Sequence, residues 1–293
     1  MSIIKVVLDW FANTNHAGFC VAQEKGYFKD FGLEVQINGK VHGAFDAQGT
    51  DIVVAPQPSL MIAMDEGEKL CAVATLTQKC DSGILSLKEC GITSPKHLEG
   101  KRLTHWTPQW FHEVLGESVR MDGGNYEKVK LINKDVGDIE ATLGKDADAV
   151  WVYQNWEYFV MKDAGADVNY FAFSDVCPLF DFAAPAVGAA QDLIDNRPQD
   201  LRNFLAALDQ GYIDAARNPE QTATLIKPYM PQVSQDLLNK SQRHLSPILL
   251  DDTGHWGTIK DSRWDRFADW MVKRGLVSQR RENEFTNAFL RKS

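Results

Sequence analysis

The sequence predicts an α/β protein with two lobes, each built on a doubly wound, mainly parallel sheet with flanking helices. Strand-like and helix-like hydrophobic patterns alternate along most of the chain, as in parallel sheets joined by crossover helices. The 293 residues exceed what one core usually holds, and from Gln191 onward the pattern is almost wholly helical. Helices without strands of their own need an earlier sheet to pack on. We therefore expect the chain to cross to a second lobe and return, with a hinge and a cleft between the lobes.

The first lobe is expected to begin with residues 1–83, in which two helices separate four strands. Alternating or continuous apolar runs predict strands at 3–9, 33–38, 51–55 and 69–77. A helix is predicted within 16–28, ending at Gly26, and another over 58–66, followed by Gly67. Glycine commonly follows the C-terminus of a helix.

The second lobe is expected to cover residues 84–185 and to repeat the strand and helix alternation. Strands are predicted at 83–88, 127–133, 147–153 and 168–173, and the segment 94–106 is predicted as a helical turn followed by a strand. Helices are predicted at 108–124, 136–144 and 154–165.

Residues 186–293 are expected to return to the first lobe as helices, after a short extended segment at 182–190. The clearest amphipathic helix covers 199–219, where apolar residues are spaced by three and four: Leu201, Phe204, Leu205, Leu208 and Tyr212. A second helix is predicted over 262–275, with Ser262 as its N-cap and Gly275 just beyond its end.

The charge balance excludes two classes of partner. The formal net charge is −9, and the one short basic cluster, "SQRRENEF", is followed at once by acids. Nucleic acid and anionic membrane surfaces both need a positive surface, so neither is expected as a partner. No apolar run reaches the length of a membrane span.

The five cysteines are odd in number and contain no C-x-x-C pair, so no zinc site is expected. No metal and no cofactor is predicted. The N-terminus opens directly into a strand without a leader pattern. The protein is expected in the periplasm or at the outer cell surface if a leader was removed, and in the cytoplasm if Met1 is the native start.

Aromatic and polar residues collect where predicted strands end, which is where open α/β sheets bind ligands. They follow strands in both predicted lobes, and the set comprises Asp9, Trp10, Asn13, His16, Gln57, Trp106, Tyr153, Trp156, Glu157 and Asp181. Aromatic faces stack on flat rings, and a carboxylate accepts two hydrogen bonds from an amidine-like edge. The combination predicts a site for a flat, nitrogen-rich ring.

Each of these residues also has a structural explanation, and both readings stay open. Trp10 could fill the end of the sheet, and Asn13 could cap a helix. Gln57 could cap the following helix, and Trp156 could belong to the core. Asp181 is harder to explain in this way, because an isolated carboxylate between Phe180 and Phe182 needs a partner.

The stretch "LDWFANTNHAGFCVAQEKGYFKDFGLEV" resembles the N-terminal signature of the thiamine-pyrimidine family of type 2 periplasmic-binding-protein folds. "DIVVAPQPSLMIAMDEG" and "HWGTIKDSRWDRFADWMVKRGLV" resemble later parts of the same family. The family contains solute-binding proteins of ABC importers and pyrimidine phosphate synthases. The resemblance implies a two-lobed Venus-flytrap fold. It also implies ligand contacts at these positions: Asp9, Trp10, Asn13, His16, Gln57, Tyr153 through Glu157, and Asp181.

The resemblance also shows departures from the synthases. Their lysine that holds pyridoxal phosphate and their histidine that donates its ring correspond to Ala55 and Ser59, which cannot perform either step. Their cysteine-rich run corresponds to "LFDFA", and their glycine-containing phosphate loop to "THWTPQW". These departures favour binding without catalysis.

The leading hypothesis is therefore an ABC-importer-type solute-binding protein for a thiamine-precursor aminopyrimidine, with an ABC permease as its partner. Two alternatives stay open: a pyrimidine phosphate synthase, and a binding protein for another flat ring such as a flavin. The sequence leaves undecided the exact ligand, the native compartment and the oligomeric state.

Overall fold

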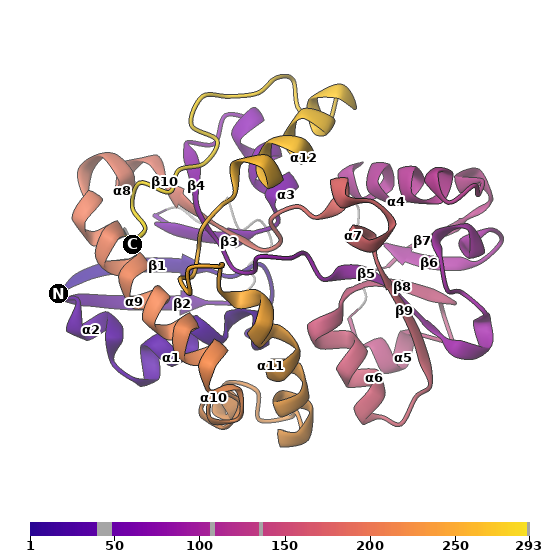
Figure 1. Cartoon of the computed structure of the whole chain (residues 1–293), viewed down its shortest axis with the longest axis horizontal. Helices are drawn as coiled ribbons and strands as arrows, with labels where there is room; N and C mark the ends of the chain where they lie inside the picture. Colours follow the sequence, from indigo (N-terminus) through magenta and orange to yellow (C-terminus); the bar gives the residue numbers. More distant parts are fainter. Residues whose placement is uncertain (40–48, 106–108, 135–136, 292–293) are drawn as a thin grey trace. The chain divides into compact units, whose positions relative to one another are not determined.

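The computed structural model describes residues 1–39, 49–105, 109–134 and 137–291 (Figure 1). The chain forms two compact units: unit 1 comprises Met1–Lys79 and Phe182–Ser293, and unit 2 comprises Cys80–Asp181. The predicted boundaries fall a few residues later, after 83 and 185. Cys80 and Asp181 are the first and last residues of unit 2, and the Cys80 N–H donates to the Asp181 carboxylate at 2.7 Å.

The sheet of unit 1 has five strands in the order β2-β1-β3-β10-β4. β1 pairs in parallel with β2 and β3, and β10 runs antiparallel between β3 and β4. The strands are β1 (Ser2–Val7), β2 (Leu33–Asn38), β3 (Ile52–Ala55), β4 (Leu70–Thr75) and β10 (Ala186–Ala190).

The sheet of unit 2 has the order β7-β6-β8-β5-β9. β6 is parallel to β7 and β8, and β5 is antiparallel to β8 and β9. The strands are β5 (Ser82–Leu87), β6 (Arg102–His105), β7 (Lys130–Asn133), β8 (Ala149–Tyr153) and β9 (Val168–Ala172).

These two mixed sheets with flanking helices confirm the predicted α/β class. In each sheet the strand that runs antiparallel to both of its neighbours, β10 or β5, is the one that follows a passage of the chain from one unit to the other. Parallel neighbours need a long crossover connection, usually a helix. Short passages provide none, so the strands that follow them are free to run antiparallel.

In unit 1, α9 lies beside α1, α2 and α10, while α3 contacts α12 (Figure 1). All five apolar residues of the predicted amphipathic helix are buried in α9, which confirms its inward face. The helices are η1 (Thr14–His16), α1 (Ala17–Glu24), α2 (Tyr27–Asp30), α3 (Gln57–Asp65), α8 (Gln191–Asn196), α9 (Pro198–Arg217), α10 (Pro219–Ile226), η7 (Lys227–Tyr229), α11 (Gln235–Leu249) and α12 (Asp261–Lys273).

The helix predicted to end at Gly26 is α1, because Gly26 adopts a φ of 77° and separates α1 from α2. One other helix prediction for unit 1 needs correction. Lys260, not Ser262, is the N-cap of α12. Gly275 follows α12 with a φ of 66°, as the sequence predicts.

In unit 2 the helices are shorter than predicted, and α4, which ends at Met121, comes nearest to its predicted range. The predicted helix over 154–165 begins as a π-helix, η5, and continues as α6. The helices are η2 (Lys88–Cys90), η3 (Pro95–Leu98), α4 (Gln109–Met121), η4 (Tyr126–Lys128), α5 (Ile139–Thr142), η5 (Gln154–Tyr158), α6 (Phe159–Asp163), α7 (Phe173–Val176) and η6 (Pro178–Phe180).

Two glycines allow α1 and α9 to approach closely. A Cβ on Gly211 would lie 2.2 Å from the carbonyl oxygen of Gly18, and a Cβ on Gly18 would lie 2.2 Å from the ring of Tyr212. The Tyr212 hydroxyl donates to the carbonyl of Asn15 at 2.8 Å. This contact fixes α1, and the loop just before it, against the helical part of unit 1.

A buried arginine holds both passages of the chain on the unit 1 side. Arg263 of α12 is 6% exposed, and its two terminal nitrogens donate to the carbonyls of Thr77 at 2.7 Å and Phe182 at 2.9 Å. Thr77 lies just before the chain leaves unit 1, and Phe182 is where it re-enters. Arg263 therefore fixes the two segments to one helix.

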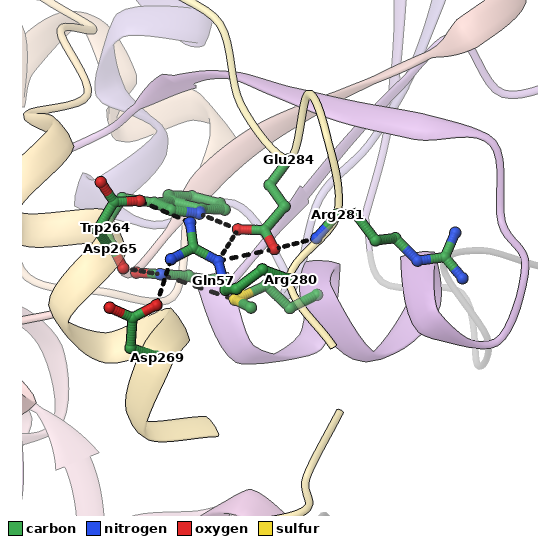
Figure 2. A network of polar contacts seen from close by, with 8 residues as sticks. Gln57, Trp264, Asp265, Asp269, Arg280, Arg281 and Glu284 are labelled. Atoms are coloured by element: carbon green, nitrogen blue, oxygen red, sulfur yellow. Dashed lines mark hydrogen bonds and ion pairs between the residues drawn. The ribbon is translucent and has the colours of Figure 1, made fainter. Parts of the chain in front are cut away.

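The segment after α12 is fastened by a network around Arg280 (Figure 2). The guanidinium donates to Asp265 and Asp269 of α12 at 2.6 Å each, and to the buried Glu284 at 3.0 Å. Glu284 also accepts from the indole N–H of Trp264 at 3.1 Å. The network joins the closing segment of the chain to α12.

Asp251 organises the loop that follows α11. Its Oδ1 accepts from the backbone N–H groups of Thr253 at 2.9 Å and His255 at 3.1 Å, and its Oδ2 accepts from the Thr258 hydroxyl at 2.6 Å. Burial raises the pKa of this carboxyl, but the hydrogen bonds outweigh burial and lower the pKa to about 2.

Replacing Asp251 by Asn is expected to lower the free energy of unfolding by about 1–2 kcal/mol at pH 7. The folded pKa lies below the ordinary value of 3.8, so the contribution is present above that value and is lost as pH falls toward 2. Urea unfolding at pH 7 and pH 3 should show the gap between wild type and D251N narrowing at pH 3. D252N, which changes a neighbour whose side chain is 97% exposed, is the control. An equal gap at both pH values would contradict the assignment.

Candidate functional site

The candidate residues of unit 1 lie at the carboxyl end of β1. The loop after Val7 runs through Asp9 and Trp10 into η1 and α1. Because β1 and β3 are parallel, the turn from β3 into α3 opens at the same edge of the sheet. Ligands of α/β sheets bind outside this edge.

Asp9, Asn13 and His16 form one hydrogen-bonded group. The Nε2 of His16 lies 2.9 Å from the Oδ1 of Asp9, and the N–H of Asn13 donates to the Nδ1 of His16 at 3.3 Å. The Asn13 side chain caps η1 by accepting from the N–H of Asn15 at 2.9 Å. His16 is 1% exposed and the Asp9 side chain 17%, so Asp9 is the member of the group that solvent can reach.

Trp10 and Phe11 provide aromatic surface beside this group. Their ring centroids are 5.2 Å apart, at an interplanar angle of 45°. Trp10 is half-buried, whereas Phe11 is 46% exposed. Sequence reasoning missed Phe11, although its place between Trp10 and Asn13 was a usable signal.

Gln57 has a structural role instead of an open position. Its amide nitrogen donates to the carbonyl of Trp264 at 2.9 Å, and its amide oxygen accepts from the N–H of Ala183 at 3.2 Å (Figure 2 shows the Trp264 side). Its own backbone N–H donates to the Ala183 carbonyl at 2.8 Å. A side chain that is 0% exposed and bonded in this way has no atom to offer a ligand, so we leave Gln57 out of the proposed site.

The candidate residues of unit 2 follow β8. Tyr153 is the last residue of β8, and the π-helix η5 contains Trp156 and Glu157. Glu157 Oε2 accepts from the N–H of Tyr153 at 3.2 Å, which folds the carboxylate back over the strand end. Trp156 is buried, whereas Tyr153 and Glu157 are half-buried. π-helices are rare and frequently occur at functional sites.

Asp81 is a second carboxylate at this end of β8, and sequence reasoning missed it. Its Oδ2 accepts from the N–H of Asn155 at 3.0 Å, in the first turn of η5. Its backbone carbonyl accepts from Gln154 N–H at 2.9 Å and from the Tyr170 hydroxyl at 2.5 Å. Burial, followed by the charge of Asp81, raises the pKa of Tyr170 well above its ordinary value. In the sequence, the available signal was an acid directly before an apolar strand.

Asp181 links the two ends of unit 2, because its Oδ1 accepts from the Cys80 N–H at 2.7 Å. This gives the carboxylate the partner that its position between two Phe residues demands. Its role as a ligand contact stays a prediction. Trp106 lies outside the described residues, and its predicted role stays a prediction too.

The structure thus brings the predicted residues together in two groups, one in each unit. Asp9, Asn13 and His16 share hydrogen bonds after β1, and Tyr153 and Glu157 share one after β8. Within the described ranges, no group of three or more His, Cys, Asp or Glu side chains is arranged to hold a metal ion. No helix in those ranges has both the length and the apolarity of a membrane span.

A family described as "NMT1/THI5 like" matches residues 13–222, which is well over half of the chain and includes Asn13, His16 and the group after β8. The chain belongs to the NMT1/THI5-like family. This membership confirms the resemblance that the N-terminal signature carries.

Curated relatives of this NMT1/THI5-like chain include both binding proteins and enzymes. A formylaminopyrimidine-binding protein of Halalkalibacterium halodurans is 25% identical over 95% of this chain and 87% of its own length. A 4-amino-5-hydroxymethyl-2-methylpyrimidine phosphate synthase of Legionella pneumophila is 19% identical over 82% of this chain and 77% of its own length. Both similarities span most of the two chains.

Solved structures confirm the predicted fold of this family member. The periplasmic aliphatic sulphonate-binding protein of Escherichia coli matches with a TM-score of 0.73 and 13% identity, over 95% of this chain and 94% of that one. Identity at this level shows the fold alone, which is the periplasmic-binding-protein fold.

Proposed function

We propose that the protein is a solute-binding protein for a small heteroaromatic ligand, of the thiamine-precursor aminopyrimidine class. The observation that carries the proposal is the pairing of an aromatic ring with a carboxylate after a central strand in each unit. Trp10 follows Asp9 after β1, and Tyr153 is hydrogen-bonded to Glu157 after β8. Rings supply stacking surface and carboxylates accept from amino groups, as an aminopyrimidine requires.

The relative that binds formylaminopyrimidine supports the same ligand class. In this proposal the partner is an ABC permease, and the protein works in the periplasm or at the outer cell surface. The proposed ligand contacts are Asp9, Trp10, Tyr153 and Glu157, with Trp106, Trp156 and Asp181 as further members.

Replacing Trp10 by Ala is expected to weaken the binding of 4-amino-5-hydroxymethyl-2-methylpyrimidine roughly 30-fold, because stacking and apolar burial are both lost. W10F should retain most of the affinity. Isothermal titration calorimetry on the purified chain measures both, with M121A as a control at an exposed apolar side chain of unit 2. Equal affinity of wild type and W10A would remove Trp10 from the site.

A native mass spectrum of the purified protein tests the ligand class directly. A bound mass that matches an aminopyrimidine supports the proposal, whereas the mass of a flavin would favour a flavin-binding protein.

The enzyme alternative is favoured by the Legionella pneumophila synthase among the relatives. It requires a lysine for pyridoxal phosphate, and the position that corresponds to this lysine is the buried Ala55 at the end of β3. The alternative predicts an absorbance change on adding pyridoxal phosphate that borohydride makes permanent. We expect no such change. Observing it would favour the enzyme alternative over the proposed solute-binding function.

A further inference from the structure

The tautomer of His16 follows from its two neighbours. Nδ1 accepts the N–H of Asn13 at 3.3 Å, so Nδ1 carries a lone pair and no proton. The ring proton of the neutral imidazole is then on Nε2, which lies 2.9 Å from Asp9 Oδ1 and donates to it. A doubly protonated ring would direct a second N–H at the N–H of Asn13, and the buried position offers that proton no water.

This tautomer fixes the chemistry of Asp9. The imidazole donates one hydrogen bond, which uses one of the two oxygens of the Asp9 carboxylate. Among the described residues, His16 is the one group that hydrogen-bonds to Asp9. The side chain is 17% exposed, so its second oxygen can accept from a ligand but has no proton to give.

We propose that His16 is a positioning residue that holds Asp9 as an acceptor-only carboxylate, and that Asp9 thereby selects rings with an N–H-bearing edge over rings whose matching edge is an oxo group. The inference deepens the proposed function and rests on it for the identity of the ring. An amino or amidinium edge satisfies the free oxygen of Asp9. An oxo edge would set two acceptors against each other and leave both desolvated without a partner.

The positions of Asp9 and His16 are set by the fold. Asp9 lies two residues after the core strand β1, and the Asn13 cap begins the turn that places His16 at the start of α1. The edge-on contact of His16 with Phe19, at 6.4 Å between ring centroids, orients the imidazole further. Asp9 therefore has one defined orientation before any ligand arrives, which favours discrimination between similar rings.

The test compares two probes on the full chain by calorimetry: 4-amino-5-hydroxymethyl-2-methylpyrimidine and its 4-oxo counterpart. Wild type is expected to bind the amino ring roughly 100-fold more tightly. D9N should reduce this preference to within about tenfold, because an amide can turn its NH₂ toward an oxo group. D30N, which removes an exposed carboxylate in α2 of the same unit, should leave the preference unchanged.

The role of His16 is tested by a conservative and a non-conservative variant. H16Q keeps an N–H donor and should retain the amino preference, whereas H16L removes the donor and should lose it. A purely structural role would make both variants lose affinity for the two rings in equal proportion.

¹⁵N NMR of the histidines in the free wild-type protein gives a readout without ligand, and it holds even if H16L fails to fold. The expected signature is a neutral ring with its proton on Nε2.

The outcomes separate this inference from the proposed function. Equal binding of both rings by wild type would support the binding function and overturn the role of Asp9. If neither ring binds, the proposed function and the selectivity are overturned together. A proton on Nδ1, or an imidazolium at neutral pH, would overturn the positioning role of His16 whatever the ligand.

Discussion

Replacing Arg263 by Met is expected to lower the free energy of unfolding of unit 1 by about 3–5 kcal/mol. The guanidinium is buried and donates to the carbonyls of Thr77 and Phe182, which methionine would leave without these donors. Both carbonyls belong to the segments by which the chain leaves and re-enters unit 1. The substitution should therefore destabilise the segments around Thr77 and Phe182 as well as the core of unit 1.

Urea unfolding followed by tryptophan fluorescence measures this loss. R263K should recover part of it, because an ammonium can donate to one of the two carbonyls but lacks the planar fork of arginine. R266M is the matched control, since Arg266 lies in the same helix and is exposed.

Hydrogen exchange of backbone amides adds a local readout. The amides of Leu76 and Gln78, which donate to Pro185 and Ile248, should exchange faster in R263M. If R263M unfolds at the same urea concentration as R266M, the hydrogen bonds of Arg263 contribute nothing to the free energy of unfolding.

Replacing Gly211 by Ala is expected to destabilise unit 1 by about 3 kcal/mol, although alanine is the better helix former. The new Cβ would lie 2.2 Å from the carbonyl oxygen of Gly18, which is backbone and cannot rotate away. α1 and α9 must then separate, and the hydrogen bond from Tyr212 to Asn15 would lengthen. Because Asn15 lies in η1, the loop with Asp9 and His16 would move too.

The same urea titration checks this prediction, with Q210A as a control at the neighbouring, half-buried position of α9. Q210A should change the free energy of unfolding by less than about 0.5 kcal/mol. A G211A protein as stable as Q210A would mean that the two helices can part without cost. Ligand titration of G211A should also show weaker binding of the aminopyrimidine, if the loop after β1 is its site.

Much of the fold could be predicted because it depends on local patterns. The spacing of Leu201, Phe204 and Tyr212 identified the buried face of α9, and the apolar runs located the strands. The antiparallel directions of β5 and β10 could not be predicted in this way. A strand's apolar pattern reports that it is buried, not which neighbour it pairs with.

The candidate site also has a part that the sequence predicted and a part that it could not predict. Polar residues at strand ends were visible in the sequence, and Asp9 and His16 prove to be hydrogen-bonded across seven positions of one loop. Gln57 looked equally suitable, but its amide is used by Ala183 and Trp264, which are distant in sequence. Asp81 was missed because its partner Asn155 lies 74 positions away.

By itself the sequence determined the α/β class, the helical return to unit 1 and the family signature around Asp9–His16. Only the tertiary structure decided which polar side chains hold the protein together and which remain open to a ligand. The physical reason is that hydrophobic periodicity records which face of an element is buried. A hydrogen bond, in contrast, depends on atoms that folding brings within about 3 Å from remote parts of the chain.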